Sequence, residues 1–150
     1  LKYGALSNQA AKDYVFDIDR FTSFEGDTGP YILYTIVRIK SILNKYAEQG
    51  GDLEGLTLLE AGGSSEKELE MALVQFNTMV RNAADEIAPH KVCAYIYDLA
   101  NAFNHFYHET RILAEEDEAK RRSLIGLLAL TRDVLETSVD LLGFSAPEKM

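Results

Sequence analysis

The sequence predicts an all-α protein, a helical bundle of about five helices. Apolar residues recur every three or four positions in several long stretches, which is the spacing of one helix face. Alternating patterns of β-branched residues, typical of strands, are few. The chain has 150 residues, of which 47% are apolar and 26% charged, enough for one domain with its own core.

The first long helix is predicted from Thr28 to the glycines at positions 50 and 51. Pro30 falls in its first turn, where the missing N–H does no harm, and Gly50 is a typical helix stop. Residues 48–64, rich in glycine and serine, are predicted as a long surface loop. The apolar face of the helix comprises Ile32, Ile36, Ile39, Leu43 and Tyr46.

A second helical stretch is predicted after this loop. Ser65 and Glu68 have the spacing of a capping box, in which each side chain bonds a backbone N–H near the other. Asn77 is expected to interrupt the stretch, because asparagine competes for backbone hydrogen bonds. The apolar face comprises Leu69, Leu73, Phe76, Val80, Ala83, Ala84 and Ile87.

Two further helices are predicted, one from Pro89 and one from near Glu116 to Gly143. The first has an apolar stripe of Val92, Tyr95, Ile96, Leu99, Ala102, Phe103 and Phe106. The second has Leu124, Leu127, Leu128, Val134, Leu135, Leu141 and Leu142. Residues 1–27 are less regular, and we interpret them as a connector, with a compact ordered loop at residues 24–29. Residues 28–150 then form the helical domain.

The net charge of −9 argues against a protein that coats nucleic acid indiscriminately. Residues 1–50 carry six basic and six acidic residues, so the excess negative charge lies in residues 51–150. The acidity is therefore compatible with an RNA-binding surface in the first third of the chain.

Cys93 is the sole cysteine, so it forms no internal disulfide and suits a reducing compartment, the cytoplasm. The longest runs without a charged residue are about ten residues, against the roughly 20 of a membrane helix. We therefore expect no membrane span. The chain opens without an initiator methionine, and we expect it to be part of a longer protein.

Histidines and carboxylates offer weak candidates for chemistry. His105, His108 and Glu109 are spaced to share one helix face, but two histidines from one helix do not make a metal site, and we expect none. The acidic run at residues 115–118 and the basic run at 120–122 pair at i,i+4, as on a solvated helix face. Phosphate-binding loops of recognised spacing and a serine nucleophile elbow are missing from the sequence, so catalysis within these residues is unsupported.

Two tyrosines open the first long helix. Tyr31 and Tyr34 lie one turn apart directly after the glycine-bearing loop. They either seal the rim of the core or stack unpaired bases, whose phosphates Arg38 and the helix N–H groups would meet.

The loop and this helix carry a resemblance to a known family. Residues 24–31 read FEGDTGPY, with Arg38 seven positions on, and resemble the signature that opens the C-terminal domain of arginyl-tRNA synthetases. Residues 1–7 and 13–17 resemble the segment that leaves the catalytic core of that family. Residues 88–90, 95–107 and 141–150 resemble its helical anticodon-binding domain, of the DALR type.

The resemblance implies which residues bind the anticodon loop of the arginine tRNA. The loop at residues 24–29 corresponds to the family's ordered loop, Tyr31, Tyr34 and Tyr107 to its aromatic contacts, and Met150 to a terminal residue near the anticodon. Arg38 is implied as a phosphate contact, and Arg111 or Ile112 lies near a further one. The implied set is Phe24, Glu25, Gly26, Asp27, Thr28, Gly29, Tyr31, Tyr34, Arg38, Tyr107, Arg111, Ile112 and Met150.

The resemblance also implies a parent protein, a class I ligase that joins arginine to its tRNA with ATP and magnesium in the cytoplasm. Residues 1–27 would lead from its catalytic domain, which is the second implied partner. The ATP-binding motifs of that domain do not occur in this sequence, so these residues alone should not charge tRNA. Leu33, Thr35 and Ile36 depart from common family residues, which shifts base reading toward backbone and tyrosine groups.

Two other functions stay open on the residues. In one, the acidic segment at residues 52–70 and the aromatic rim recruit a partner helix, as in a protein-interaction module with no RNA role. In the other, His105, His108 and Glu109 converge inside the bundle of a metal-dependent hydrolase.

Overall fold

The structure is a computed structural model that describes residues 1–13 and 15–150; Tyr14, within the motif at residues 13–17, lies outside the described residues. The described residues form helices and no strand, which confirms the all-α prediction. Five of the helices in the described residues have ten or more residues, as expected. The elements are α1 Lys2–Leu6, α2 Ile18–Thr22, α3 Gly29–Glu48, α4 Ser64–Val74, α5 Phe76–Asp85, α6 Pro89–Glu109, η1 Ile112–Ala114 and α7 Glu118–Leu141.

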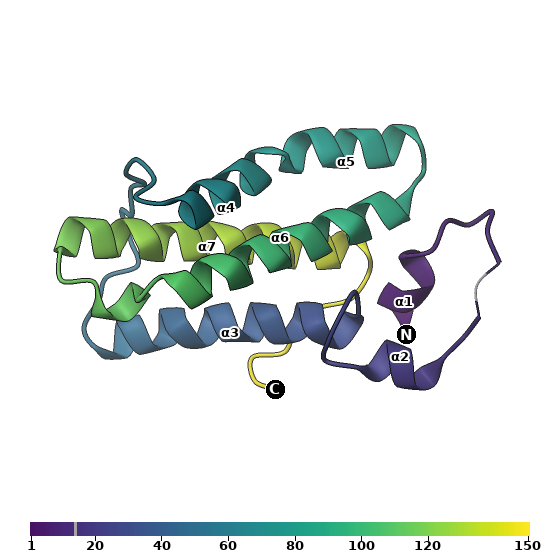
Figure 1. The fold of residues 1–150 in the computed structure, drawn as a ribbon, viewed down its shortest axis with the longest axis horizontal. Helices are drawn as coiled ribbons and strands as arrows, with labels where there is room; N and C mark the ends of the chain where they lie inside the picture. Colours follow the sequence, from purple (N-terminus) through teal and green to yellow (C-terminus); the bar gives the residue numbers. More distant parts are fainter. Residues whose placement is uncertain (14) are drawn as a thin grey trace.

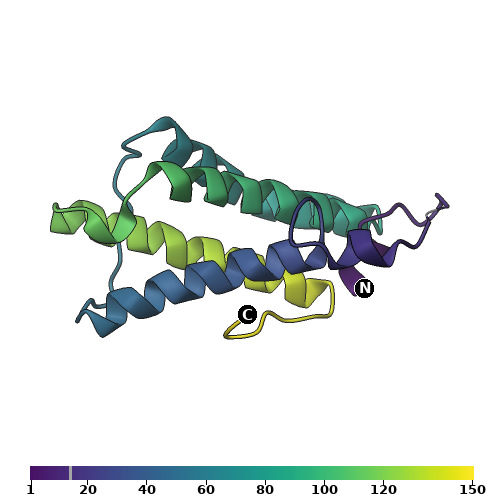
Figure 2. The same ribbon diagram turned by 60° about the horizontal axis from the view of Figure 1, so that its bottom comes forward.

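The long helices pack around α6. The successive helices α4 and α5 cover one side of α6, while α3 and α7 pack against each other and against its other side (Figure 1). Figure 2 shows α3 and α7 together below α6. Each of these long helices except α5 contributes to the largest fully buried side chains, which include Ile32, Ile36, Leu69, Ile96, Phe103, Phe106 and Leu124.

The predicted boundaries of α3 are confirmed. Thr28 caps its N-terminus by accepting a hydrogen bond from the N–H of Tyr31 at 3.2 Å, and Pro30 lies in the first turn. The helix ends at Glu48, and Gly50 follows with a φ of 84° that favours glycine.

Other boundaries differ from the prediction. The capping box of Ser65 and Glu68 is wrong: the N-cap of α4 is Gly63, two residues earlier than predicted, and Glu66 accepts the N–H of Gly62 at 2.7 Å. The break between α4 and α5 falls at Gln75, two residues before the position predicted.

Three predicted core residues lie on the surface, the first being Ala84 near the end of α5. Ile87 is 89% exposed and has a φ of 50°. The helical spacing of apolar residues extends to Ile87, but α5 ends at Asp85. Leu141 is 56% exposed at the last turn of α7.

The start of α7 binds the long loop. Its N-cap is Asp117, which accepts the N–H of Lys120, so the helix begins two residues later than predicted. Arg122 donates to the backbone carbonyls of Asp52 and Glu54 at 3.0 and 2.8 Å, rather than pairing with Glu118. The loop is therefore fastened to α7.

Residues 1–27 contain α1 and α2, which helical periodicity missed because each has five residues. Tyr3 of α1 is 2% exposed and donates a hydrogen bond to Asp27 Oδ1 at 2.5 Å. Its hydroxyl also lies 3.1 Å from the carbonyl oxygen of Cys93 in α6. Lys2 donates to the carbonyl of Gly143 at 2.5 Å. This segment thus packs on the bundle and supports the loop that follows.

Within the described residues, every helix is too short or too polar to cross a membrane. Cys93 is buried, and burial raises the pKa of its thiol to about 12. The thiol is therefore protonated at neutral pH.

Candidate nucleic-acid interface

The loop before α3 is ordered by its own backbone and hydroxyl groups. Ser23 Oγ accepts the N–H of Glu25 at 3.1 Å, and Thr28 Oγ1 donates to the carbonyl of Ser23 at 2.6 Å. The N–H of Thr28 bonds the carbonyl of Gly26, whose φ of 78° favours glycine. The loop therefore holds a compact shape with Phe24 and Glu25 exposed.

An aromatic–arginine cluster, defined as Phe24, Tyr34, Arg38 and Tyr107, lies beside this loop. The rings of Phe24 and Tyr34 meet edge to face, with centroids 6.3 Å apart. The guanidinium carbon of Arg38 lies 4.8 Å from the ring centroid of Tyr34 and 5.2 Å from that of Tyr107. Phe24 is 58% exposed, Tyr34 41% and Tyr107 36%, so their rings are accessible to a ligand.

Tyr31 has a different environment from Tyr34. It is half-buried between α3 and α6, where its hydroxyl donates to Asn101 Oδ1 at 2.7 Å and accepts from Asn104 Nδ2 at 2.9 Å. Its ring meets Tyr97 edge-on with centroids 5.8 Å apart. Of the two alternatives left open, Tyr31 thus fits sealing the rim of the core, whereas Tyr34 presents its ring to solvent.

Asn104 of α6 connects Arg38 and Tyr31 of α3 through hydrogen bonds. This residue was not identified from the sequence. Its Oδ1 accepts a hydrogen bond from Arg38 Nη1 at 2.7 Å. Its Nδ2 donates to the hydroxyl of Tyr31 and lies 3.3 Å from Thr35 Oγ1. The available signal was two asparagines, Asn101 and Asn104, at i,i+3 beside the apolar stripe of α6, where a half-buried amide needs partners.

Arg111 and Ile112 follow α6 and form one wall of a surface pocket of about 380 Å³ next to Tyr107. Arg111 is exposed, whereas Ile112 is 4% exposed and belongs to the core. Met150 is 54% exposed. Among the contacts described for residues 1–13 and 15–150, none joins Met150 to the aromatic–arginine cluster.

A buried lysine binds the C-terminal tail. Lys40 in α3 is 8% exposed and lies 2.7 Å from carboxylate oxygens of both Glu136 and Glu148. The two hydrogen-bonded carboxylates raise the pKa of Lys40 despite the opposing effect of burial. The tail therefore runs beside α3, where the chain end appears in Figure 1.

His105, His108 and Glu109 lie on the outside of the bundle rather than converging within it. His105 Nδ1 lies 2.9 Å from Glu68 Oε2, and its Nε2 lies 3.3 Å from Glu109 Oε1. The hydrogen bond with Glu68 and the charge of Glu109 raise the pKa of His105. The described residues form no group of metal-ligating side chains, and His105 instead ties α4 to α6. The outward positions exclude the hydrolase in the form considered.

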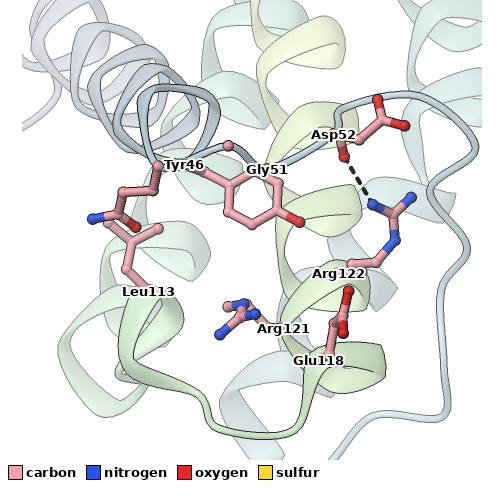
Figure 3. Close-up of a pocket in the computed structure, with 9 residues that line it drawn as sticks. Tyr46, Gly51, Asp52, Leu113, Glu118, Arg121 and Arg122 are labelled. Atoms are coloured by element: carbon pink, nitrogen blue, oxygen red, sulfur yellow. Dashed lines mark hydrogen bonds between the residues drawn. The ribbon is translucent and has the colours of Figure 1, made fainter.

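A polar pocket of about 320 Å³ lies at the far end of α3, between Tyr46 and the start of α7. Figure 3 shows the Arg122 side chain reaching the backbone carbonyl of Asp52. A side chain on Gly51 would lie 2.4 Å from the Tyr46 ring, which explains the glycine. These contacts fasten the long loop, and the pocket is separate from the aromatic–arginine cluster.

Comparison with known proteins defines the class of this helical domain. Residues 32–150 match the DALR anticodon binding domain family, and the chain belongs to that family. This membership does not favour the protein-interaction module.

Individual relatives narrow the comparison from this family to one kind of enzyme. The chain is 60% identical over its full length to an arginine–tRNA ligase of Agathobacter rectalis, of which it covers 26%. It is 54% identical to the corresponding ligase of Alkaliphilus oremlandii, of which it covers 25%. Arginyl-tRNA synthetase of Thermus thermophilus superposes on 99% of the chain with a TM-score of 0.89 and 33% identity, the chain covering 26% of that protein. The chain thus spans about a quarter of the length of these relatives.

Proposed function

We propose that this domain binds the anticodon loop of an arginine tRNA as part of an arginine–tRNA ligase. The observation that carries the proposal is the exposed aromatic–arginine cluster beside an ordered loop, in a chain that belongs to the DALR anticodon binding domain family. The 60% identity to the ligase of Agathobacter rectalis supports arginine as the amino acid joined to the tRNA.

Binding uses stacking and loop hydrogen bonds rather than a broad basic surface. Unpaired bases of an RNA loop stack on aromatic rings, and Phe24, Tyr34 and Tyr107 expose such rings. Arg38 lies between two of them and provides a positive charge for a phosphate. The backbone of residues 24–29, held in one shape by its internal hydrogen bonds, contributes donors and acceptors to base edges.

The other implied residues have distinct parts in this proposal. Tyr31 and Thr28 hold the start of α3 in place, whereas Arg111 and Met150 extend the contact surface. Ile112, which is buried, supports the turn that carries Arg111.

The complete ligase supplies the chemistry. ATP and magnesium bind its catalytic domain, which residues 1–27 connect to this helical domain, and the protein acts in the cytoplasm. The role of residues 28–150 is to select the tRNA.

The test is binding of arginine tRNA by the full-length ligase carrying Tyr34→Ala or Tyr107→Ala. Each change removes a stacking ring and should weaken binding by about 1–3 kcal/mol. Phe76→Ala, in the first turn of α5 and against Tyr95 of α6, is the control away from the cluster and should leave tRNA affinity unchanged. Unchanged binding by both tyrosine variants, with circular dichroism showing an intact fold, would contradict the proposal.

A further inference from the structure

The aromatic–arginine cluster continues along α3 into the pocket beside Tyr107. Tyr34, Arg38, Ile42 and Lys45 follow at intervals of four, four and three residues and therefore share one face of α3. Seven residues separate Arg38 from Lys45, which is about 10 Å along the helix axis. Tyr107 belongs to both surfaces, because it contacts Arg38 and also lines the pocket with Ile42 and Lys45.

The pocket is basic although the chain is acidic. Its two charged lining residues are Lys45, from α3, and Arg111, from the turn after α6, and the described lining residues include no carboxylate. Among the residues that the structure describes, no ion pair involves either side chain, unlike Lys40, which binds two carboxylates. Lys45 and Arg111 are both exposed. Two free cations across a groove of about 380 Å³ favour an anionic ligand.

The position of the groove indicates which kind of anion it binds. It begins where the exposed rings end, and a strand that continued from Tyr34 and Tyr107 along α3 would reach Lys45. A sugar–phosphate backbone carries one negative charge per nucleotide and matches a line of Arg38, Lys45 and Arg111.

We infer that the groove between Lys45 and Arg111 binds the phosphate backbone of the RNA strand that leaves the aromatic–arginine cluster. Lys45 is thus a further RNA-binding residue, outside the loop and first turns of α3. This inference rests on the proposed function, since it extends the same binding surface.

The test measures how tRNA affinity of the full-length ligase depends on salt. A protein that loses one phosphate contact releases fewer counterions, and the slope of log affinity against log salt falls by about 0.7–0.9. Lys45→Gln and Arg111→Gln should each lower the affinity and reduce the slope by about this amount. Lys45→Arg, which keeps the charge, should retain the slope.

Lys67→Gln is the matched control, because Lys67 is an exposed lysine of α4 on the other side of α6. It should leave both affinity and slope unchanged. An unchanged slope for Lys45→Gln, in a ligase whose tRNA affinity falls with Tyr34→Ala, overturns the groove and leaves the proposed function intact. If neither Lys45→Gln nor Tyr34→Ala lowers the tRNA affinity, both the groove and the proposed function are overturned. An equal slope change for Lys67→Gln also overturns the groove, since the effect is then one of net charge.

Discussion

Asn104 is the residue that most directly determines the geometry of the aromatic–arginine cluster. One end of its amide accepts from Arg38 and the other donates to Tyr31, so a single side chain on α6 fixes two residues of α3. An amide used at both ends holds its partners in one arrangement. Arg38 is thereby kept against the rings of Tyr34 and Tyr107 rather than free in solvent.

Replacing Asn104 by alanine should weaken tRNA binding through Arg38. The change removes a hydrogen bond to a charged group, which typically contributes about 1.5–3 kcal/mol, and leaves the Tyr31 hydroxyl one partner short. Binding should weaken by about 1–2 kcal/mol. Asn104→Asp keeps an acceptor for Arg38 but adds a negative charge beside it and removes the donor to Tyr31, so it should not restore the affinity.

A double-mutant cycle tests whether Asn104 acts by positioning. In a background of Arg38→Ala, the effect of Asn104→Ala on tRNA affinity should largely disappear. An effect of the same size in both backgrounds would mean that Asn104 influences binding by another route.

A local motif marked only part of the proposed site. Residues 24–31 and Arg38 form one continuous run, and the structure brings Phe24, Tyr34 and Arg38 together. Tyr107 comes from a helix 70 residues later, and only the family resemblance pointed to it. Asn104 was missed because its role depends on how α6 packs against α3, which sequence spacing within one helix does not contain.

At the scale of elements, α1 and α2 meet at one close contact. A methyl group on Gly4 would lie 2.4 Å from the ring of Phe21, so these short helices touch at a point that requires glycine. Gly4→Ala should therefore push the helices apart and lower the free energy of unfolding by about 1–3 kcal/mol, as overpacking does.

Urea unfolding of the chain measures this effect. Combining Gly4→Ala with Phe21→Leu, which makes room for the methyl group, should cost less than the sum of the two single changes. Additive losses would show that the contact does not limit the packing of α1 on α2.

The elements that the sequence predicted well are those with complete local signals. Thr28 as cap, Pro30 in the first turn and Gly50 after the end specify α3 without reference to the rest of the protein. The start of α4 differs from the prediction because Glu66, rather than Glu68, reaches back to the N-terminal backbone and accepts the N–H of Gly62, while Glu68 bonds His105 of α6. The five-residue helices α1 and α2 are too short for periodicity, and their stability comes from packing, as the burial of Tyr3 shows.

At the scale of the whole molecule, two sides of the bundle differ in charge and role. The acidic residues between positions 52 and 70 lie in the long loop and in α4, whereas the aromatic–arginine cluster lies where α3 meets the end of α6 (Figure 1). Excess negative charge elsewhere discourages indiscriminate RNA binding while leaving the cluster free to bind one loop. The bundle is a rigid support, and the proposed RNA-binding residues lie in the loop, on α3 and around the end of α6.

Photo-cross-linking from position 34 tests whether the exposed ring of Tyr34 contacts the bases of the anticodon loop. The full-length ligase would carry the photoreactive residue p-benzoylphenylalanine in place of Tyr34, with Tyr95, on the side of α6 that faces α4, as the control position. After irradiation with arginine tRNA, the cross-linked nucleotides are mapped. The proposed contact predicts cross-links to unpaired bases of the anticodon loop from position 34 and none from position 95. Cross-links from position 34 to the acceptor or D arm, or a yield no higher than from position 95, would contradict it.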